Sequence, residues 1–317
     1  MKLSIVTTLY RSAPYIEEFH RRTSEAARQF AGEEYEIVMV NDGSPDESLD
    51  KALPLVARDP HLKVVNLSRN FGHHKALMTG LRHAAGDFVF LLDSDLEDEP
   101  EWLLPFADRL EAEKCDVVYG VQAKRKGSIF EQVSGALYYK CINILCSMEL
   151  PRNLVTARLM RRRYVNALLS HHEREIIFGC LCVITGFKQS PHVIVKHSTS
   201  PSTYTFIKKL DLIISTVTSF SAYPLKLIFW IGTLIFACSS GYGLYLVYRK
   251  FFLAQIMDGW TSIMTSVWIL GGLIIAFLGI IGLYLANIFS ETKRRPLTIV
   301  SEVYDGSDIA APAAKNE

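Results

Sequence analysis

The sequence predicts an α/β protein with a doubly wound, mostly parallel sheet, followed by two C-terminal transmembrane helices. In residues 1–200, short β-rich runs alternate with helical patterns through short loops, which is typical of a parallel sheet. The apolar run at 88–92 is short and continuous, as in a strand buried on both faces. Residues 222–289 contain two apolar segments, each longer than the roughly 20 residues that cross a bilayer.

Four strands are expected in the N-terminal part, each indicated by a run of apolar and β-branched residues. These runs are residues 2–10, 35–40, 62–67 and 88–92. The first ends at a turn and helix-start signal around Pro14, and the helix that follows carries Ile16 and Phe19 on its apolar side. A further strand is expected from Val117.

Acidic residues follow two of these strands at the point where each ends. Asp42 follows the second strand in an Asn-Asp-Gly-Ser stretch that is also an ordinary turn sequence, and Asp93 and Asp95 follow the fourth. Ligands of open α/β sheets bind beyond the carboxyl ends of the strands. Two carboxylates one residue apart repel each other unless a cation separates them, so Mg²⁺ or Mn²⁺ is expected at Asp93 and Asp95. A surface acidic turn is the alternative for such a pair taken alone.

Composition excludes several other classes. The net charge is +1 over 317 residues, so bulk charge does not point to a nucleic-acid partner. No Gly-x-Gly-x-x-Gly follows the first strand and no Walker loop is present, so the usual dinucleotide and P-loop signatures are missing. The six cysteines show no paired zinc spacing, and Cys180 and Cys182 are expected to be buried packing residues in a reduced, cytosol-facing protein. No secretory signal is expected at the start.

Several stretches together resemble the inverting family 2 glycosyltransferases, whose fold is the nucleotide-sugar-binding GT-A type. The matching stretches are 41–46, 69–72, 86–87 and 93–100. The resemblance is strongest to the polyprenyl-phosphate glycosyltransferases, the group of dolichol-phosphate mannose synthase and the bactoprenol glucosyltransferases. It extends into the residues 282–296 that end the second apolar segment and follow it.

The resemblance implies roles for individual residues. Asp42 would contact the nucleotide base, and Asp93 and Asp95 the ribose and the metal-bound diphosphate. The donor-binding residues that it implies are Tyr10, Asp42, Ser44, Lys75, Asp93 and Glu97. Catalysis is expected to use Asp93, Asp95 and Arg158, and the acceptor phosphate to meet Lys124, Arg125 and Lys196, whose charges offset phosphate repulsion. The basic run at 124–126, taken alone, is more typical of a solvated loop.

The chain departs from the family pattern at three informative positions. Glu97 stands where relatives usually have Gln, and only Tyr10 is kept from the motif after the first strand. Thr156 stands where relatives commonly have an Asp that is assigned as a base near the acceptor. A phosphate acceptor is already ionised near neutrality and needs no strong base, whereas a sugar hydroxyl would need one. The departure therefore permits a phosphate acceptor.

The predicted regions of the chain follow from its hydropathy. They are a catalytic domain 1–200, an interfacial helix 201–221, two transmembrane helices within 222–290 (about 222–247 and 263–289), and a cytoplasmic tail 291–317 with a disordered end. Another helix is expected at 128–148, on the membrane surface or in the core. Lysines and arginines flank the two spans on their outer sides, which places the catalytic domain and both termini in the cytoplasm.

The resemblance, together with the two predicted spans, implies a metal-dependent, inverting hexosyltransferase in the inner membrane. It would move a sugar from a nucleotide diphosphate-sugar, expected to be a UDP-sugar, to an undecaprenyl-type polyprenyl phosphate at the cytoplasmic face. One alternative is an enzyme of the same fold that uses a lipid-linked sugar hydroxyl in surface-polysaccharide assembly, and another is a non-catalytic membrane scaffold. Small residues such as Gly271 and Gly282 allow helices to approach closely, within one chain or between subunits, so the sequence is compatible with a homo-oligomer.

Overall fold

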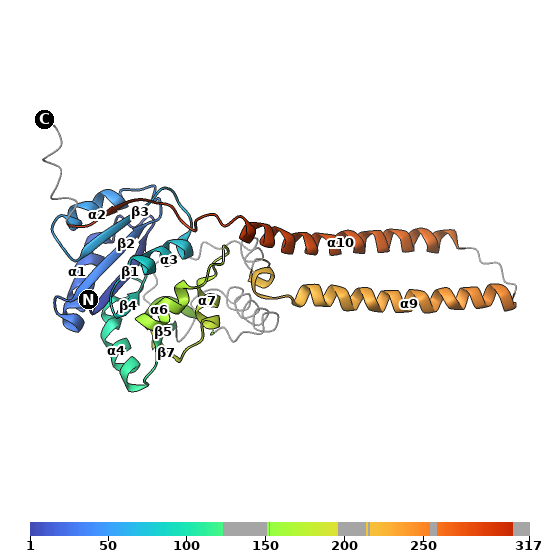
Figure 1. Cartoon of the computed structure of the whole chain (residues 1–317), viewed down its shortest axis with the longest axis horizontal. Helices are drawn as coiled ribbons and strands as arrows, with labels where there is room; N and C mark the ends of the chain where they lie inside the picture. The colour runs from blue at the N-terminus through green and yellow to red at the C-terminus, as the bar shows by residue number, and fades with distance from the viewer. Residues whose placement is uncertain (123–150, 152, 196–213, 215, 254–258, 307–317) are drawn as a thin grey trace, which may run out of the picture. The chain divides into compact units, whose positions relative to one another are not determined.

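A computed structural model describes residues 1–122, 151, 153–195, 214, 216–253 and 259–306 of the chain (Figure 1). The chain forms two compact units. The first comprises Met1–Tyr139, Met148–Thr203 and Arg295–Glu317, and the second comprises Lys140–Ser147 and Tyr204–Arg294. The helix expected at 128–148 and most of the interfacial helix expected at 201–221 lie outside the described residues.

The described part of the first unit is built on an eight-stranded sheet with the order β7-β5-β6-β4-β1-β2-β3-β8. Its strands are β1 (Leu3–Leu9), β2 (Tyr35–Asn41), β3 (Leu62–Leu67), β4 (Phe88–Leu91), β5 (Val117–Gln122), β6 (Leu154–Arg161), β7 (Gln189–Ile194) and β8 (Val300–Tyr304). Four of the seven neighbouring pairs are parallel, and the three antiparallel pairs all involve β6 or β8. The predicted α/β class with a mostly parallel sheet is confirmed.

Helices cover both faces of this sheet (Figure 1). They are α1 (Ile16–Ala31), α2 (Ser48–Val56), α3 (His73–His83), α4 (Leu103–Ala112), α6 (Arg162–Leu169) and α7 (Phe178–Ile184), with the short 3-10 helix η1 (Pro100–Trp102) before α4. Helix α1 contacts α2 and α4, while α3 contacts α6. Crossovers between parallel strands are right-handed, so the direction in which the chain moves across the sheet decides which face the connecting helix covers. When that direction reverses, the helix lies on the opposite face. Helix α3 makes that reversal, between β3 and β4.

The hydrophobic core explains why these segments form strands and helices. Every residue of β1 and β2 is buried, as expected for central strands covered on both faces. The apolar side of α1, including Ile16 and Phe19, packs into the core that the sequence pattern predicted. Cys180 and Cys182 are buried free thiols in α7, which confirms their predicted packing role.

The strand order identifies where a ligand would bind. Strands β2 and β3 follow β1 outward in one direction, and β4 then lies on the other side of β1. Open α/β sheets bind ligands outside the carboxyl ends of the strands at such a reversal. The chain segments that leave this edge of the sheet begin at Tyr10 after β1, Asp42 after β2 and Leu92 after β4. The acidic residues singled out in the sequence therefore lie at the expected edge.

The C-terminal segment returns to the sheet of the first unit. Strand β8 pairs antiparallel with β3, and the Ser68 backbone N–H donates to the Ile299 carbonyl at 3.0 Å. The hydroxyl oxygens of Thr79 in α3 and Thr298 lie 2.7 Å apart. The sequence pattern placed residues 291–317 in a tail and did not predict this strand. The polypeptide thus leaves the first unit before the long helices and rejoins it after them.

The second unit contains two long helices, α9 (Tyr223–Leu253) and α10 (Trp260–Thr292). In α10, the stretch Ile269–Thr292 is long and apolar enough to cross a membrane and is not buried by the chain. The apolar stretch of α9, Tyr223–Ser239, is shorter than a full span. Among the described residues there is therefore one candidate membrane-crossing helix, and the second predicted crossing stays a prediction.

Candidate functional site

Asp42, at the end of β2, forms hydrogen bonds with the loop that follows the neighbouring strand β3. Its side chain is buried at the end of β2, where Oδ1 accepts from the Phe71 backbone N–H at 2.7 Å and Oδ2 from that of Gly72 at 3.1 Å. The Asn70 side-chain amide donates to the Asp42 carbonyl at 3.1 Å. Burial raises the pKa of Asp42, while the two backbone donors and the charges of His73 and Arg69 oppose the rise. Asp42 therefore fixes the loop between β3 and α3.

Gly43 allows close contact between the loop after β2 and the loop between β3 and α3. Its φ is +57°, and a Cβ there would lie 2.4 Å from the Asn70 backbone nitrogen. Neither the conformation nor the contact suits a residue with a side chain.

Gly43→Ala is therefore expected to lower the free energy of unfolding by about 2–5 kcal/mol, the sum of a left-handed backbone cost and an overpacking cost. Thermal unfolding of the full chain measures the loss. Gly32→Ala is the matched control, because Gly32 has φ +62° and nothing within 4 Å of the added Cβ. Equal losses in the two variants would mean that the two loops are not in contact.

The Asp-Ser-Asp segment after β4 is anchored by its middle residue. The buried Ser94 hydroxyl donates to the Thr8 carbonyl at 2.9 Å and lies 2.8 Å from the Ser12 hydroxyl oxygen. Asp95 is exposed, and its Oδ1 accepts from the Glu97 backbone N–H at 3.0 Å. The loop is thus tied to the end of β1, and the Asp95 carboxylate stays open to solvent.

His73 lies between the ends of β1 and β4, and sequence reasoning did not select it. It is the first residue of α3, with Nδ1 3.0 Å from Thr8 Oγ1 and Nε2 3.6 Å from Asp93 Oδ1. Desolvation lowers the pKa of His73, and the carboxylates of Asp42 and Asp95 oppose this effect. The structure therefore brings Asp42, Asp93 and Asp95 to one site around His73. The available signal was a histidine pair directly after Gly72 at a helix start.

Tyr10 and Ser44 lie on adjoining loops at the same edge. Tyr10 is 47% exposed just after β1, and the backbone N–H of Arg11 donates to the Ser44 hydroxyl at 2.8 Å. The Ser44 hydroxyl in turn donates to Asp46. Although desolvation acts to raise the pKa of Asp46, hydrogen bonds from Ser44, Ser48 and the Ala13 backbone outweigh it and hold the pKa at about 2. These contacts fix the loop that carries Ser44.

The remaining predicted donor residues are neighbours of this group along the chain. Lys75 belongs to the first turn of α3, two residues after His73, and it is partly buried. Glu97 is also partly buried, and its backbone N–H donates to Asp95. Both positions are compatible with contacts to a ligand at the site. Lys124, Arg125 and Lys196, the predicted acceptor-phosphate residues, lie outside the described residues.

Arg158 is a buried cation at the same edge of the sheet. In β6 it pairs with Leu91, two residues before Asp93, and its side chain is 3% exposed. Its guanidinium donates to Cys182 Sγ and to the Thr156 carbonyl at 3.2 Å, and lies 4.8 Å from the Phe178 ring centroid. Within the described ranges, no carboxylate lies at ion-pair distance from Arg158. Arginine presents paired N–H donors that match phosphate oxygens, so this position is compatible with an anionic ligand nearby.

The residues at the site fit a divalent metal only in part. Across the described stretches, no group of three or more His, Cys, Asp or Glu side chains is arranged to hold a metal ion. Mg²⁺, however, is commonly held by one or two carboxylates, with substrate phosphates and water completing its shell. Asp93 and Asp95 supply oxygen ligands of that kind at a partly open loop. These two carboxylates therefore fit a divalent metal that also needs the phosphate oxygens of a bound ligand to complete its coordination shell.

Comparisons with known proteins show what the chain is similar to. The family model described as "Glycosyl transferase family 2" matches residues 4–169. A Mycobacterium tuberculosis (strain CDC 1551 / Oshkosh) protein described as a glycosyltransferase is 45% identical over 98% of this chain and 90% of its own length. The bactoprenol glucosyl transferase of Shigella phage SfII is 28% identical over 97% of this chain and 100% of its own. Among solved structures, mannosyltransferase PcManGT from Pyrobaculum calidifontis covers 93% of this chain and 88% of its own, with a TM-score of 0.49 and 15% identity.

Proposed function

Because the chain belongs to glycosyl transferase family 2 and is a glycosyltransferase, we propose that it moves a sugar from a nucleotide diphosphate-sugar to a polyprenyl phosphate. One observation supports this proposal most strongly. Asp42, Asp93 and Asp95 lie near His73, at the edge of the sheet where the strand order reverses. The buried cation Arg158 at the same edge supports substrates that carry phosphate.

The donor would lie across the ends of β1, β2 and β4. We assign the nucleoside to the part of the site formed by Tyr10, Asp42 and Ser44, and the diphosphate to the part formed by Asp93 and Asp95. Mg²⁺ or Mn²⁺ bound by these two carboxylates would supply positive charge to the leaving diphosphate. Lys75 and Glu97 flank this position from α3 and from the loop after β4.

The acceptor is assigned from the chemistry of the site and from a relative. Thr156 on β6 has a hydroxyl and no carboxylate, so it does not supply a general base. A phosphate acceptor needs no general base, because it is already ionised. An acceptor oxygen would form the new bond to the anomeric carbon on the face opposite the leaving group, with inversion. The bond to the nucleoside diphosphate would break, releasing that diphosphate. The name of the 28% identical phage relative supports a polyprenyl phosphate as acceptor.

The path of the chain supports a two-span membrane topology. The chain up to Thr203 and strand β8 after α10 both belong to the first unit, so the chain between Thr203 and β8 crosses a membrane an even number of times or not at all. If Ile269–Thr292 crosses, a second crossing is required, and α9 is the long helix available for it. The basic residues Lys293, Arg294 and Arg295 support a cytoplasmic side for the first unit.

An acceptor comparison tests the proposed reaction. The full chain in lipid nanodiscs, supplied with labelled UDP-sugars and Mg²⁺, is expected to transfer label to undecaprenyl phosphate and not to a lipid-diphosphate-sugar. The expected preference follows because only the phosphate acceptor reacts without a base at Thr156. Transfer to the lipid-diphosphate-sugar alone would establish the hydroxyl-acceptor alternative. Absence of any transfer, together with absence of nucleotide binding, would favour a non-catalytic scaffold.

A further inference from the structure

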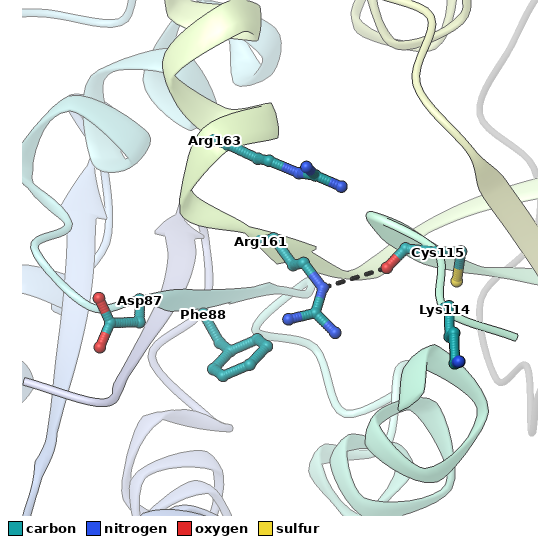
Figure 2. Close-up of a pocket in the computed structure, with 6 residues that line it drawn as sticks. All are labelled: Asp87, Phe88, Lys114, Cys115, Arg161 and Arg163. Atoms are coloured by element: carbon teal, nitrogen blue, oxygen red, sulfur yellow. Dashed lines mark hydrogen bonds between the residues drawn. The ribbon is translucent and has the colours of Figure 1, made fainter. Parts of the chain in front are cut away.

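The first unit has a hollow at the edge of the sheet opposite the site just described. It has a volume of about 570 Å³. Asp87, Phe88, Lys114, Cys115, Arg161 and Arg163 line it (Figure 2), and these six residues are called the basic hollow here. Phe88 begins β4 and Arg161 ends the antiparallel β6, whereas Asp93 follows the other end of β4. The basic hollow therefore does not belong to the proposed catalytic edge.

Two guanidinium groups in the basic hollow are held in place by neighbouring acids. Arg161 donates to Glu111 at 2.7 Å and to the Cys115 carbonyl at 3.2 Å, and its guanidinium lies 5.4 Å from the Phe88 ring centroid. Arg163 donates through Nε to Asp116. Each guanidinium has five N–H donors, so both keep donors beyond these bonds. The acids orient the two arginines without using all their hydrogen-bonding capacity.

The residues that line the basic hollow carry an excess of positive charge. Three are cations and only Asp87 is an acid, while Glu111 and Asp116 are outside the lining. Figure 2 shows Arg161 between Phe88 and Lys114, with Asp87 at the far end. Lys114 is exposed on a left-handed turn, with φ +47°. This arrangement offers guanidinium and ammonium N–H donors and one separate acceptor.

We propose that the basic hollow binds a phosphate-bearing small molecule of about nucleotide size. Oriented guanidinium groups beside an ammonium group are suited to phosphate recognition, because Arg presents paired donors that match phosphate oxygens. The ring of Phe88 offers an apolar contact, and Asp87 accepts a hydrogen bond from a hydroxyl or amino group of the ligand. The volume falls within the roughly 300–1,000 Å³ of small-molecule sites. This site is independent of the proposed transfer reaction.

Titration calorimetry of the full chain in nanodiscs tests the proposal, in EDTA to remove divalent metals. The probes are inorganic phosphate, pyrophosphate and a nucleoside monophosphate. At least one is expected to bind saturably, and its Kd should rise about tenfold in Lys114→Asn and in Arg163→Gln, as for the loss of one charge-assisted hydrogen bond. Asn tolerates the left-handed turn at Lys114, and Gln keeps an amide that can donate to Asp116. Tightest binding of the nucleoside monophosphate would identify a nucleotide ligand, and equal binding of the probes would identify the phosphate group alone.

Two controls separate this site from its surroundings. Lys188→Gln removes a nearby exposed cation that does not line the basic hollow, and Asp95→Asn alters the catalytic edge; both should leave the Kd unchanged. The proposal is overturned if no phosphate probe binds saturably. It is also overturned if Lys188→Gln weakens binding as much as Lys114→Asn, or if only Asp95→Asn changes it.

Discussion

Asp95→Ala is expected to reduce sugar transfer by about a thousandfold or more while leaving the chain folded. Asp95 is exposed, and its carboxylate accepts one backbone hydrogen bond within its own loop, so its removal costs the fold little. In the proposed reaction, the carboxylate helps to hold the metal that stabilises the leaving diphosphate. Such stabilisation contributes several kcal/mol, and each ~1.4 kcal/mol is a factor of ten in rate.

Transfer rates and thermal unfolding of the purified full-length variants measure this effect. Asp108→Ala is the matched control, because it removes an exposed carboxylate from α4, away from the carboxyl ends of β1, β2 and β4. We expect both variants to unfold near the wild-type temperature and only Asp95→Ala to lose transfer. Turnover retained by Asp95→Ala would remove the metal assignment.

Arg158→Met is expected to reduce transfer about 10- to 100-fold with little loss of stability. Methionine has a similar length and needs no counter-charge, and removing a buried charge offsets the hydrogen bonds lost to Cys182 and to the Thr156 carbonyl. Catalysis should suffer because a charge-assisted contact to substrate phosphate, worth about 1.5–3 kcal/mol, is lost. The same pair of assays, transfer and thermal unfolding, measures both quantities.

Arg162→Met provides the comparison for Arg158→Met. Arg162 directly follows β6, the strand that contains Arg158, but its guanidinium donates to the Gly86 carbonyl at the other edge of the sheet. Its replacement should leave transfer per folded molecule unchanged. If Arg158→Met keeps full activity, or if both variants lose activity equally, then Arg158 has a structural role and does not meet substrate.

The site was predictable wherever a short local pattern determined it. An apolar run followed by acids predicts strand ends, so Asp42, Asp93 and Asp95 could be located before the fold was known. His73 could not be located in this way, because its role depends on contacts with Thr8 in β1 and with Asp93 in the loop after β4. The burial of Arg158 likewise depends on α7, whose Cys182 follows 24 residues later.

Strand β8 shows a different limit of sequence reasoning. Its five residues, Val300–Tyr304, are exposed or partly buried and lack the clear alternation that predicts a strand. An edge strand takes its structure from its neighbour, here β3, and that pairing spans more than 230 residues of sequence. Propensity alone does not predict such a contact, although the contact decides which unit the C-terminal segment belongs to.

In the proposed reaction, Asp93 and Asp95 share a divalent cation with the diphosphate of a nucleotide donor. Thermal unfolding of the full chain with UDP, with Mn²⁺, and with both tests it most directly, because a ligand at about 100 times its Kd stabilises the folded state by about 2.7 kcal/mol. We expect UDP and Mn²⁺ together to raise the unfolding temperature well beyond the sum of their separate effects, and Asp95→Asn to remove this excess. Equal stabilisation by UDP in Mn²⁺ and in EDTA would contradict it.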